Sequence, residues 1–93
     1  MSREEIGERL RNLRNRRRFS QRQMGRPAGL SKESVCKIEC GDRELSFDEA
    51  VAFAKVLCIS LDAFCRTEAD GRWDINACLL PYTPPPEDDD DGQ

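Results

Sequence analysis

Apolar residues recur at helical spacing near the start of the chain. Ser2 and Glu5 form a capping box, in which each side chain can accept a hydrogen bond from a free backbone amide of the first turn. The apolar positions that follow are three and four residues apart, and this spacing predicts one buried helical face. They are Ile6, Leu10 and Leu13. The pattern therefore predicts a first helix that ends near Arg18.

Two more helices are predicted after residue 45. Ser46 and Glu49 form a second capping box, which opens a helix that runs through Leu57. The residues expected to be buried on its inner face are Phe47, Val51, Ala54 and Leu57. Ser60 then caps a short helix over residues 61–65, where the compact domain is expected to close.

Residues 20–41 have the pattern of two short helices joined at Gly29. Ser20 caps the first helix, over residues 21–28, and Gly29 can turn the chain through the left-handed region at no steric cost. Ser31 caps the second helix, which Gly41 ends. Its apolar residues lie on one side and its polar residues largely on the other. The best-known use of this arrangement is to place the second helix in the DNA major groove.

The end of the chain has a different pattern. Apolar and polar residues alternate over residues 72–80, and this period of two predicts one short β-strand. From Pro81 onward the sequence is rich in proline and aspartate and has little to bury, so we expect residues 81–93 to be disordered. The predicted organisation is a domain over residues 1–66, an extension over 67–80 and an acidic tail over 81–93.

The charge of the chain is unevenly distributed. The net charge is −3, but the two halves of the chain differ in sign. Residues 1–46 carry 12 Lys/Arg against 7 Asp/Glu, whereas residues 47–93 carry 3 Lys/Arg against 11 Asp/Glu. A local basic surface of this kind is what nucleic-acid binding requires. With 93 residues the chain has room for one small domain and for no enzyme-sized cleft. It also lacks an apolar run that could span a membrane, so we expect a cytoplasmic protein.

The stretch from Ile6 to Phe64 resembles the phage repressor and Cro type of helix-turn-helix domain, the XRE family. The positions that carry the resemblance are Gln21, Met24, Gly25, Ala28, Gly29, Leu30, Val35, Ile38, the Glu39–Gly41 ending and the later VLCISLDAF. The resemblance implies a five-helix, all-α, lambda-repressor-like domain that binds double-stranded operator DNA as a dimer. The chain departs from the family pattern at Pro27, where we expect a distorted last turn, at Cys58 in place of a glycine, and at Leu45 in place of a proline.

If the domain docks as its relatives do, the start of the second motif helix reaches base edges. Lys32, Glu33, Ser34 and Lys37 are the expected base contacts, which favours a half-site that contains G·C pairs. The expected phosphate contacts are Gln21, Arg43, Arg16, Arg17 and Arg18. A simpler alternative for Arg16–Arg18 is that a basic run at a helix C-terminus relieves the helix dipole without any partner.

The same resemblance implies a buried ion pair between Arg14 in the first helix and Glu39 at the end of the second motif helix. Breaking one partner of such a pair leaves an uncompensated buried charge. We therefore expect the pair to matter for the fold before it matters for function.

Five cysteines raise the question of metal or redox chemistry. They are Cys36, Cys40, Cys58, Cys65 and Cys78. The chain has no histidine and no close C-x-x-C pair, so we expect neither a metal nor a cofactor. Reduced thiols that serve as small apolar groups are the ordinary expectation. The alternative left open is a redox-sensing repressor, in which oxidation of Cys36 or Cys40 adds bulk beside DNA.

The predicted strand of residues 72–80 offers a way to form a homodimer, by pairing with its copy across a two-fold axis. The expected interface residues are Leu61, Phe64, Trp73, Ile75 and Leu79. Two recognition helices would then lie about 34 Å apart on an inverted-repeat operator. The alternative is a local flap over the core, anchored by Trp73.

The function predicted from the sequence is a transcription regulator without catalysis, most simply a repressor that occludes promoter DNA. No spacing of nucleophile, base and orienting group indicates an enzyme. The alternative is an antitoxin or an adaptor, whose C-terminal segment binds a protein partner while the DNA domain serves autoregulation.

Overall fold

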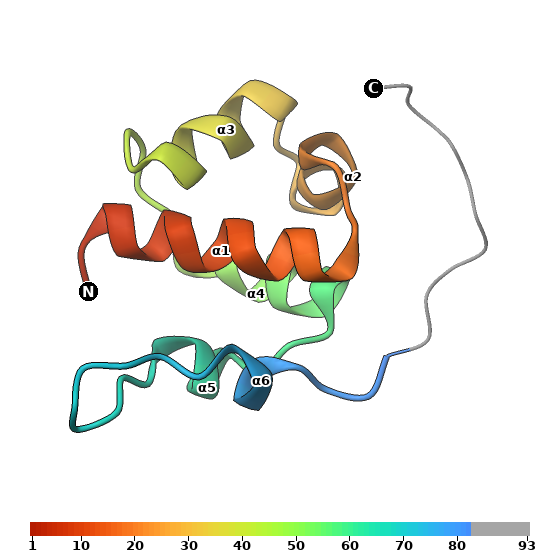
Figure 1. The fold of residues 1–93 in the computed structure, drawn as a ribbon. Coiled ribbons are helices and arrows are strands. Elements are labelled where there is room, and N and C mark those ends of the chain that lie inside the picture. The colour runs from red at the N-terminus through yellow and green to blue at the C-terminus, as the bar shows by residue number, and fades with distance from the viewer. Residues whose placement is uncertain (83–93) are drawn as a thin grey trace.

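The computed structural model describes residues 1–82, which form helices packed around one core (Figure 1). In chain order the elements are α1 (Arg3–Arg17), α2 (Gln21–Gly25), the 3₁₀ turn η1 (Arg26–Ala28), α3 (Lys32–Cys40), α4 (Phe47–Leu57), α5 (Leu61–Cys65) and α6 (Ile75–Cys78). The all-α prediction is confirmed, and residues 1–82 contain no strand. Within the same residues no helix is long and apolar enough to cross a bilayer.

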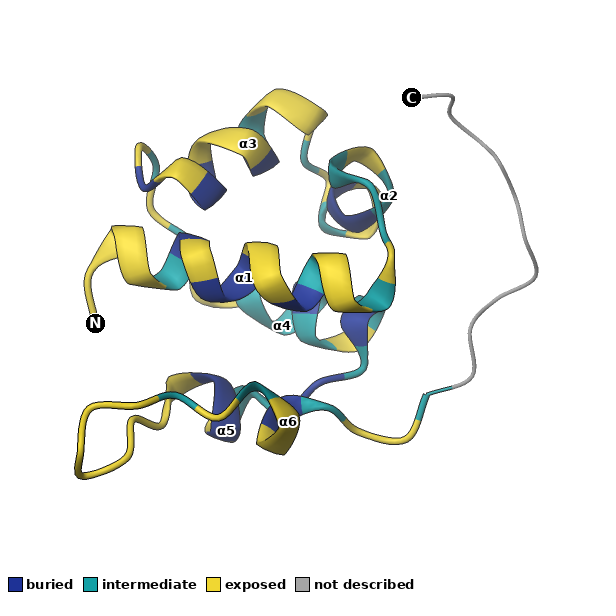
Figure 2. Cartoon of the chain, viewed as in Figure 1, coloured by how far each residue is buried: buried dark blue, intermediate teal, exposed yellow. Residues whose placement is uncertain are grey.

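The central helix, α1, lies between two groups of elements. Figure 1 shows α2 and α3 on one side of α1, and α5 and α6 on the other. The predicted capping box is present, because the Ser2 hydroxyl accepts from the Glu5 amide and the Glu5 carboxylate accepts from the Ser2 amide. The inner sides of the helices supply the buried residues (Figure 2). The largest fully buried side chains are Phe53, Leu13, Met24, Ile38, Leu57, Val35 and Cys78.

The first motif helix is shorter than residues 21–28. It ends as α2 at Gly25 and continues as the 3₁₀ turn η1, with Pro27 inside that turn. Proline has no amide to donate and crowds the carbonyl four residues earlier, so the tighter turn replaces the last turn of α-helix. The distortion expected at Pro27 is confirmed.

The inner face of α4 differs from the prediction, since Val51 and Ala54 are half-buried and Phe53, which the pattern did not predict, is buried. Leu57 is fully buried, whereas Phe47 is 77% exposed, so its predicted burial is wrong. Phe53 and Leu57, four residues apart, define the buried face. Phe47 precedes Phe53 by six positions and so lies about 120° around the helix from it. Its apolar character alone predicts that Phe47 is buried, but its angular position around the helix places it on the exposed side.

The residue that caps the C-terminus of α4 has an unusual backbone conformation. Cys58 caps the helix in the left-handed region, with φ of 56°, where the family resemblance led us to expect a glycine. A side chain in this region costs about 1–2 kcal/mol. The Cys58 Sγ donates to the carbonyl of Pro81 at 3.1 Å, which ties this strained turn to the end of the extension.

The strand predicted over residues 72–80 is wrong, because residues 75–78 form the helix α6. The Asp74 side chain accepts from the amides of Asn76 and Ala77 and so caps the start of a helix. In a strand these amides would instead be free to donate to a neighbouring strand. Cys78 counted as a polar position in the alternation, yet it is fully buried. Counted as apolar, Cys78 follows Ile75 by three residues, which is helical spacing. Within residues 1–82 the β-structure is limited to one isolated antiparallel bridge, between Ile59 and Leu79.

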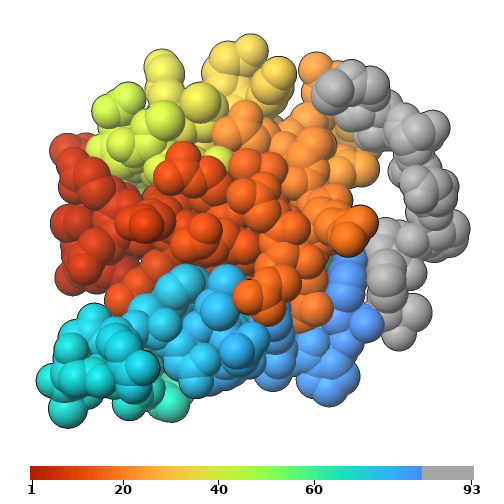
Figure 3. All heavy atoms as spheres, viewed as in Figure 1, coloured from red at the N-terminus to blue at the C-terminus, as the bar shows by residue number. Residues whose placement is uncertain are grey.

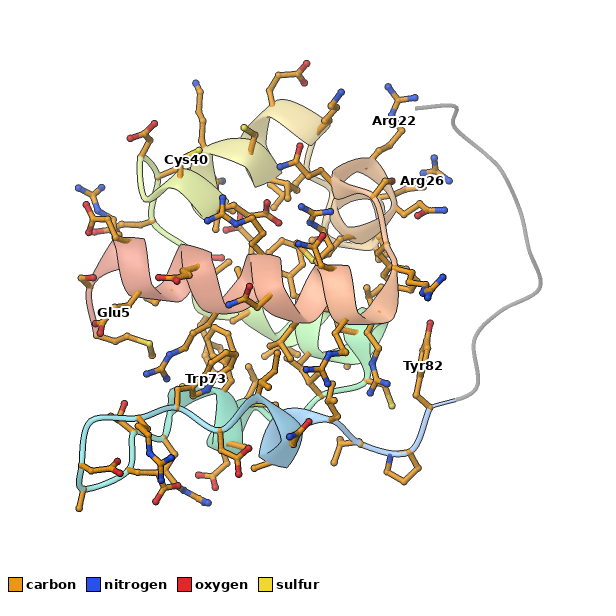
Figure 4. All side chains as sticks on the ribbon, in the orientation of Figure 1. Glu5, Arg22, Arg26, Cys40, Trp73 and Tyr82 are labelled. Atoms are coloured by element: carbon orange, nitrogen blue, oxygen red, sulfur yellow. The ribbon has the colours of Figure 1, made fainter. Side chains whose placement is uncertain are left out.

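The extension is held to the core by Arg9 of α1. The Arg9 side chain is buried and donates to the carbonyl of Phe64 at 2.7 Å and to the Thr67 hydroxyl at 3.0 Å. Its guanidinium lies 4.9 Å from the ring centre of Trp73, which packs edge-on against Phe64. Figure 4 shows Trp73 between α1 and α5. The extension is therefore a flap over the chain's own core.

The acidic tail predicted to begin at Pro81 is described only in part. Tyr82 packs edge-on against Phe19, with ring centres 6.5 Å apart. Residues 83–93, which carry the rest of the predicted disordered tail, lie outside the described residues.

Candidate nucleic-acid interface

The two motif helices are brought together at Gly25. A Cβ on Gly25 would lie 2.7 Å from Cγ2 of Val35 and 2.9 Å from the carbonyl oxygen of Leu30, so only glycine allows this approach. The turn between the helices uses Gly29, with φ of 74°. The amide of Leu30 donates to the carbonyl of Gly25 at 3.0 Å and closes the turn. The small crossing residue and the hinge predicted from the sequence are both confirmed.

The exposed side of α3 is polar and uncovered. The Ser31 hydroxyl caps the helix by accepting from the amide of Ser34 at 3.1 Å. Val35, Ile38 and Glu39 are buried against the core. The residues left exposed are Lys32, Glu33, Cys36, Lys37 and Cys40. In Figure 3, α3 forms one edge of the molecule, so these side chains are presented outward.

Three of the four predicted base contacts lie on this exposed side. Lys32, Glu33 and Lys37 extend from α3 without a described side-chain hydrogen bond. Ser34 is half-buried, and its Oγ accepts from the Ser31 hydroxyl at 3.2 Å. A group already engaged in the cap has less capacity for a base, so we expect Ser34 to add little to base recognition.

Behind α3, the ion pair implied by the resemblance is present. Arg14 Nε donates to Oε2 of Glu39 at 2.6 Å, and Nη2 donates to Oε1 at 3.1 Å. The third arginine nitrogen, Nη1, donates to the carbonyl of Phe19 at 2.9 Å. The side chains are 13% and 2% exposed, so the pair is largely shielded from water. It joins α1 to the end of α3 and fixes how α3 is presented.

Gln21 belongs to the same network. Its amide nitrogen donates to Oε1 of Glu39 at 3.0 Å, and the residue is half-buried at the first position of α2. The predicted phosphate contact of Gln21 would have to use the second amide hydrogen or the backbone N–H. The network thus couples α2, the end of α3 and α1 through one carboxylate.

Arg43 is engaged inside the chain. Its two terminal nitrogens donate to the two carboxylate oxygens of Glu49 at 3.0 and 2.9 Å, and Nη1 also donates to the carbonyl of Glu44 at 3.1 Å. The Arg43 hydrogen bonds lower the pKa of Glu49 to about 2. A phosphate contact by Arg43 would compete with this bidentate pair.

The three arginines at the end of α1 have separate positions. Arg16 donates to Oδ1 of Asn76 at 3.3 Å. Arg17 donates to the carbonyls of Leu57, Cys58 and Leu80, at 2.8, 2.9 and 2.9 Å, and its guanidinium lies 4.2 Å from the ring centre of Tyr82. Arg18 is exposed and ends α1 in the left-handed region. Of the three, Arg18 has the side chain most available to a phosphate.

Comparison with known proteins places this geometry in a family. A helix-turn-helix domain model matches residues 5–64. The chain belongs to the helix-turn-helix domain family. A similar solved structure is the restriction-modification controller protein C.AhdI from Aeromonas hydrophila, with 29% sequence identity and a TM-score of 0.62. The match covers 67% of this chain and 94% of the controller protein. Among curated proteins, none matches the chain.

Two exposed arginines of this helix-turn-helix domain were not predicted as site residues. Arg22 in α2 and Arg26 in η1 are four residues apart, and both side chains extend outward in Figure 4. Both lie in the first motif helix, beside α3. Their spacing of four residues could have indicated a shared basic face in the sequence, because residues four apart lie on the same side of a helix.

The residues predicted for a dimer interface pack within the domain and its extension. Phe64 is 4% exposed, and Trp73, Ile75 and Leu79 pack against the core. The Trp73 indole N–H donates to the carbonyl of Ala63 at 3.3 Å. Leu61 is half-buried at the start of α5. These contacts favour the flap arrangement for the extension of this helix-turn-helix chain.

Proposed function

We propose that this XRE-type chain is a transcriptional repressor, and that it binds an inverted-repeat operator as a homodimer through α3. The observation that carries the proposal is the exposed polar edge of α3, held from behind by the Arg14–Glu39–Gln21 network. A rigid helix that presents side chains with known base preferences is what reading the major groove requires.

The base contacts are assigned to Lys32, Glu33 and Lys37, with a smaller share for Ser34. Lysine donates to guanine O6 and N7, and glutamate accepts from the cytosine amino group, so a half-site with G·C pairs is proposed. The phosphate contacts are assigned to Arg18 at the end of α1, to Gln21 and Arg22 in α2 and to Arg26 in η1. Arg17 and Arg43 hold the domain together through the contacts described above, whereas Arg16 makes one exposed hydrogen bond, to Asn76.

The homodimer places two copies of α3 about 34 Å apart, one turn of DNA. Sedimentation equilibrium of the protein with a selected duplex tests this geometry. Two chains per duplex are expected, and one chain per duplex at saturation contradicts it. The cytoplasm is the proposed location, because a protein that binds an operator has to share a compartment with the DNA.

The decisive experiment is selection of bound duplexes from a random DNA library, with wild type and two variants. Lys32→Ala is expected to change the selected sequence. Arg72→Ala is the matched control, because it removes an exposed cation from the extension and should leave sequence and affinity unchanged. Selection of no duplex at low ionic strength overturns the proposal.

An antitoxin or adaptor would use residues 72–80 to bind another protein. The structure gives this second candidate no specific support, since Trp73, Ile75 and Leu79 of that segment pack on the chain's own core. Simple repression therefore remains the function proposed here.

A further inference from the structure

Two cysteines on the exposed side of α3 have no part in the proposed reading of DNA. Cys36 and Cys40 are one helical turn apart, and both thiols are free and exposed. The neighbouring position, Lys37, is among the proposed base contacts. Figure 4 shows Cys40 on α3, above α1. A ligand held by both sulfurs would therefore sit at the edge of the proposed DNA surface.

The two thiols interact with each other. A hydrogen bond with Cys36 raises the pKa of the Cys40 thiol, and the charge of Cys36 adds to this effect. The Asp42 carboxylate acts in the same direction, whereas the Arg11 guanidinium lowers the same pKa. The raised pKa means that Cys40 is a neutral thiol in the free protein, so an ion that binds there has to displace the thiol proton.

The helix geometry favours a bridging ion over a disulfide. Residues i and i+4 have Cβ atoms about 5–6 Å apart. A disulfide needs about 3.5–4.5 Å, so oxidation would have to distort the last turn of α3. Metal–thiolate bonds of about 2.3 Å let one ion span sulfurs up to about 4.6 Å apart without moving the helix.

The number of ligands selects the kind of ion. Structural Zn²⁺ takes four ligands, and the described residues contain no group of three or more His, Cys, Asp or Glu side chains suited to a metal. A soft monovalent cation such as Cu(I) needs only two thiolate ligands, and thiolates are among the ligands that it prefers. We propose that Cys36 and Cys40 form a two-thiolate site for Cu(I), and that its occupation weakens operator binding.

The charge balance explains the second half of the proposal. Two neutral thiols and one Cu⁺ give a bis-thiolate complex of net charge −1 and two protons released to solvent, with no electron transferred. The added negative charge lies beside Lys37 and opposes a nearby phosphate. For exposed charges we expect operator affinity to fall about fivefold per chain. This consequence rests on the proposed function, whereas the binding of copper does not.

Copper binding is tested first without DNA. The full chain is titrated anaerobically with Cu(I) supplied as its bicinchoninate complex, and loss of the complex's colour reports transfer to protein. One Cu(I) per chain is expected, with apparent affinity that rises about a hundredfold per pH unit below the thiol pKa, because two protons leave. Cys36→Ser and Cys40→Ser should each abolish this transfer. Cys65→Ser, which removes an exposed thiol of α5, should retain it.

Equal copper uptake by wild type and Cys36→Ser overturns the site. A disulfide between Cys36 and Cys40 that forms with hydrogen peroxide, without copper retention, also overturns it and assigns the pair to redox chemistry. Fluorescence anisotropy with a selected duplex then tests the consequence. If copper binds and duplex affinity is unchanged, the regulatory half of the proposal is wrong. If the copper-free protein binds no duplex at all, the proposed function fails, while the titration still decides the site.

Discussion

Gly7 of α1 lies directly against the backbone of Glu39 in α3. A Cβ on Gly7 would be 2.4 Å from the carbonyl oxygens of Glu39 and Ile38, a distance that real Cβ atoms do not adopt. The obstacle is backbone, so no side chain can rotate away to relieve it. Glycine at this position therefore sets how closely α3 approaches α1.

Gly7→Ala is expected to destabilise the domain by about 1–3 kcal/mol, the usual cost of overpacking a tight contact. Urea unfolding followed by far-UV circular dichroism measures the change. Gly71→Ala is the matched control, because a Cβ there meets nothing within 4 Å although φ is 88°. The two variants separate a clash from backbone strain, and a Gly7→Ala chain as stable as wild type would contradict the close approach.

Glu39→Ala is expected to cost about 3–5 kcal/mol, because Arg14 would be left as a shielded charge without its partner. The carboxylate is 2% exposed and accepts from both Arg14 and Gln21, so three elements lose a common contact. Unfolding in urea gives the stability of Glu39→Ala, of the single variants Arg14→Met and Glu39→Leu, and of the double variant Arg14→Met/Glu39→Leu. The double variant should be more stable than Glu39→Ala, since no charge is left unpaired. Additive losses would argue against the pair.

The arrangement of residues 1–65 could be predicted because the local signals agree with one another. The capping serines and the apolar spacing indicate the same helix starts, and the structure has N-caps at Ser2, Ser20, Ser31 and Ser46. Gly41 ends α3 as predicted, whereas the first motif helix ends early, at Gly25. The ion pair of Arg14 and Glu39 joins residues 25 positions apart, and only the family resemblance could supply it.

The extension could not be predicted, because its contacts are long-range. Nothing local to Arg17 shows that its guanidinium meets carbonyls of residues 40, 41 and 63 positions away. Arg43 is a different case, because its partner Glu49 is only six residues away, and the charge pattern alone does not show whether an arginine pairs with a nearby carboxylate or with a phosphate. The strand prediction near residue 78 fails for another reason: Cys78 counts as polar in the alternating pattern, whereas it is buried like an apolar residue and lies at helical spacing from Ile75.

The pair of Arg43 and Glu49 predicts a specific loss of stability in acid. The folded pKa of Glu49 is lowered from its ordinary 4.5 to about 2, so the pair's contribution is present above pH 4.5 and is lost as the pH falls towards 2. Arg43 is 34% exposed, and solvent screening reduces the contribution to about 1 kcal/mol. Urea unfolding of wild type and Glu49→Gln between pH 6 and pH 2 measures it. The difference between the two chains should shrink as the pH falls from 4.5 to 2, and a constant difference would contradict the pairing.

Arg17→Ala is expected to release the end of the extension while leaving α3 in place. The guanidinium holds the carbonyls of Leu57, Cys58 and Leu80, and the last of these is the only one in the extension. Its loss removes the side-chain donor from the partly buried carbonyl of Leu57 and one of two donors from that of Cys58, at a cost of about 1–3 kcal/mol. Hydrogen exchange should become faster at the amide of Leu80, which donates to Cys58, and stay unchanged at Val35 in the middle of α3.

Arg16→Ala provides the comparison for that experiment, because the neighbouring Arg16 makes one exposed hydrogen bond, to Asn76. It removes the same charge from the same turn of α1 but none of the three carbonyl contacts. If both variants speed exchange at Leu80 equally, charge is responsible and the carbonyl contacts are not. If only Arg17→Ala does so, and duplex affinity is kept, then Arg17 fastens the extension and contributes nothing to DNA. That result would also explain why the basic run at the end of α1 is a poor guide to phosphate contacts.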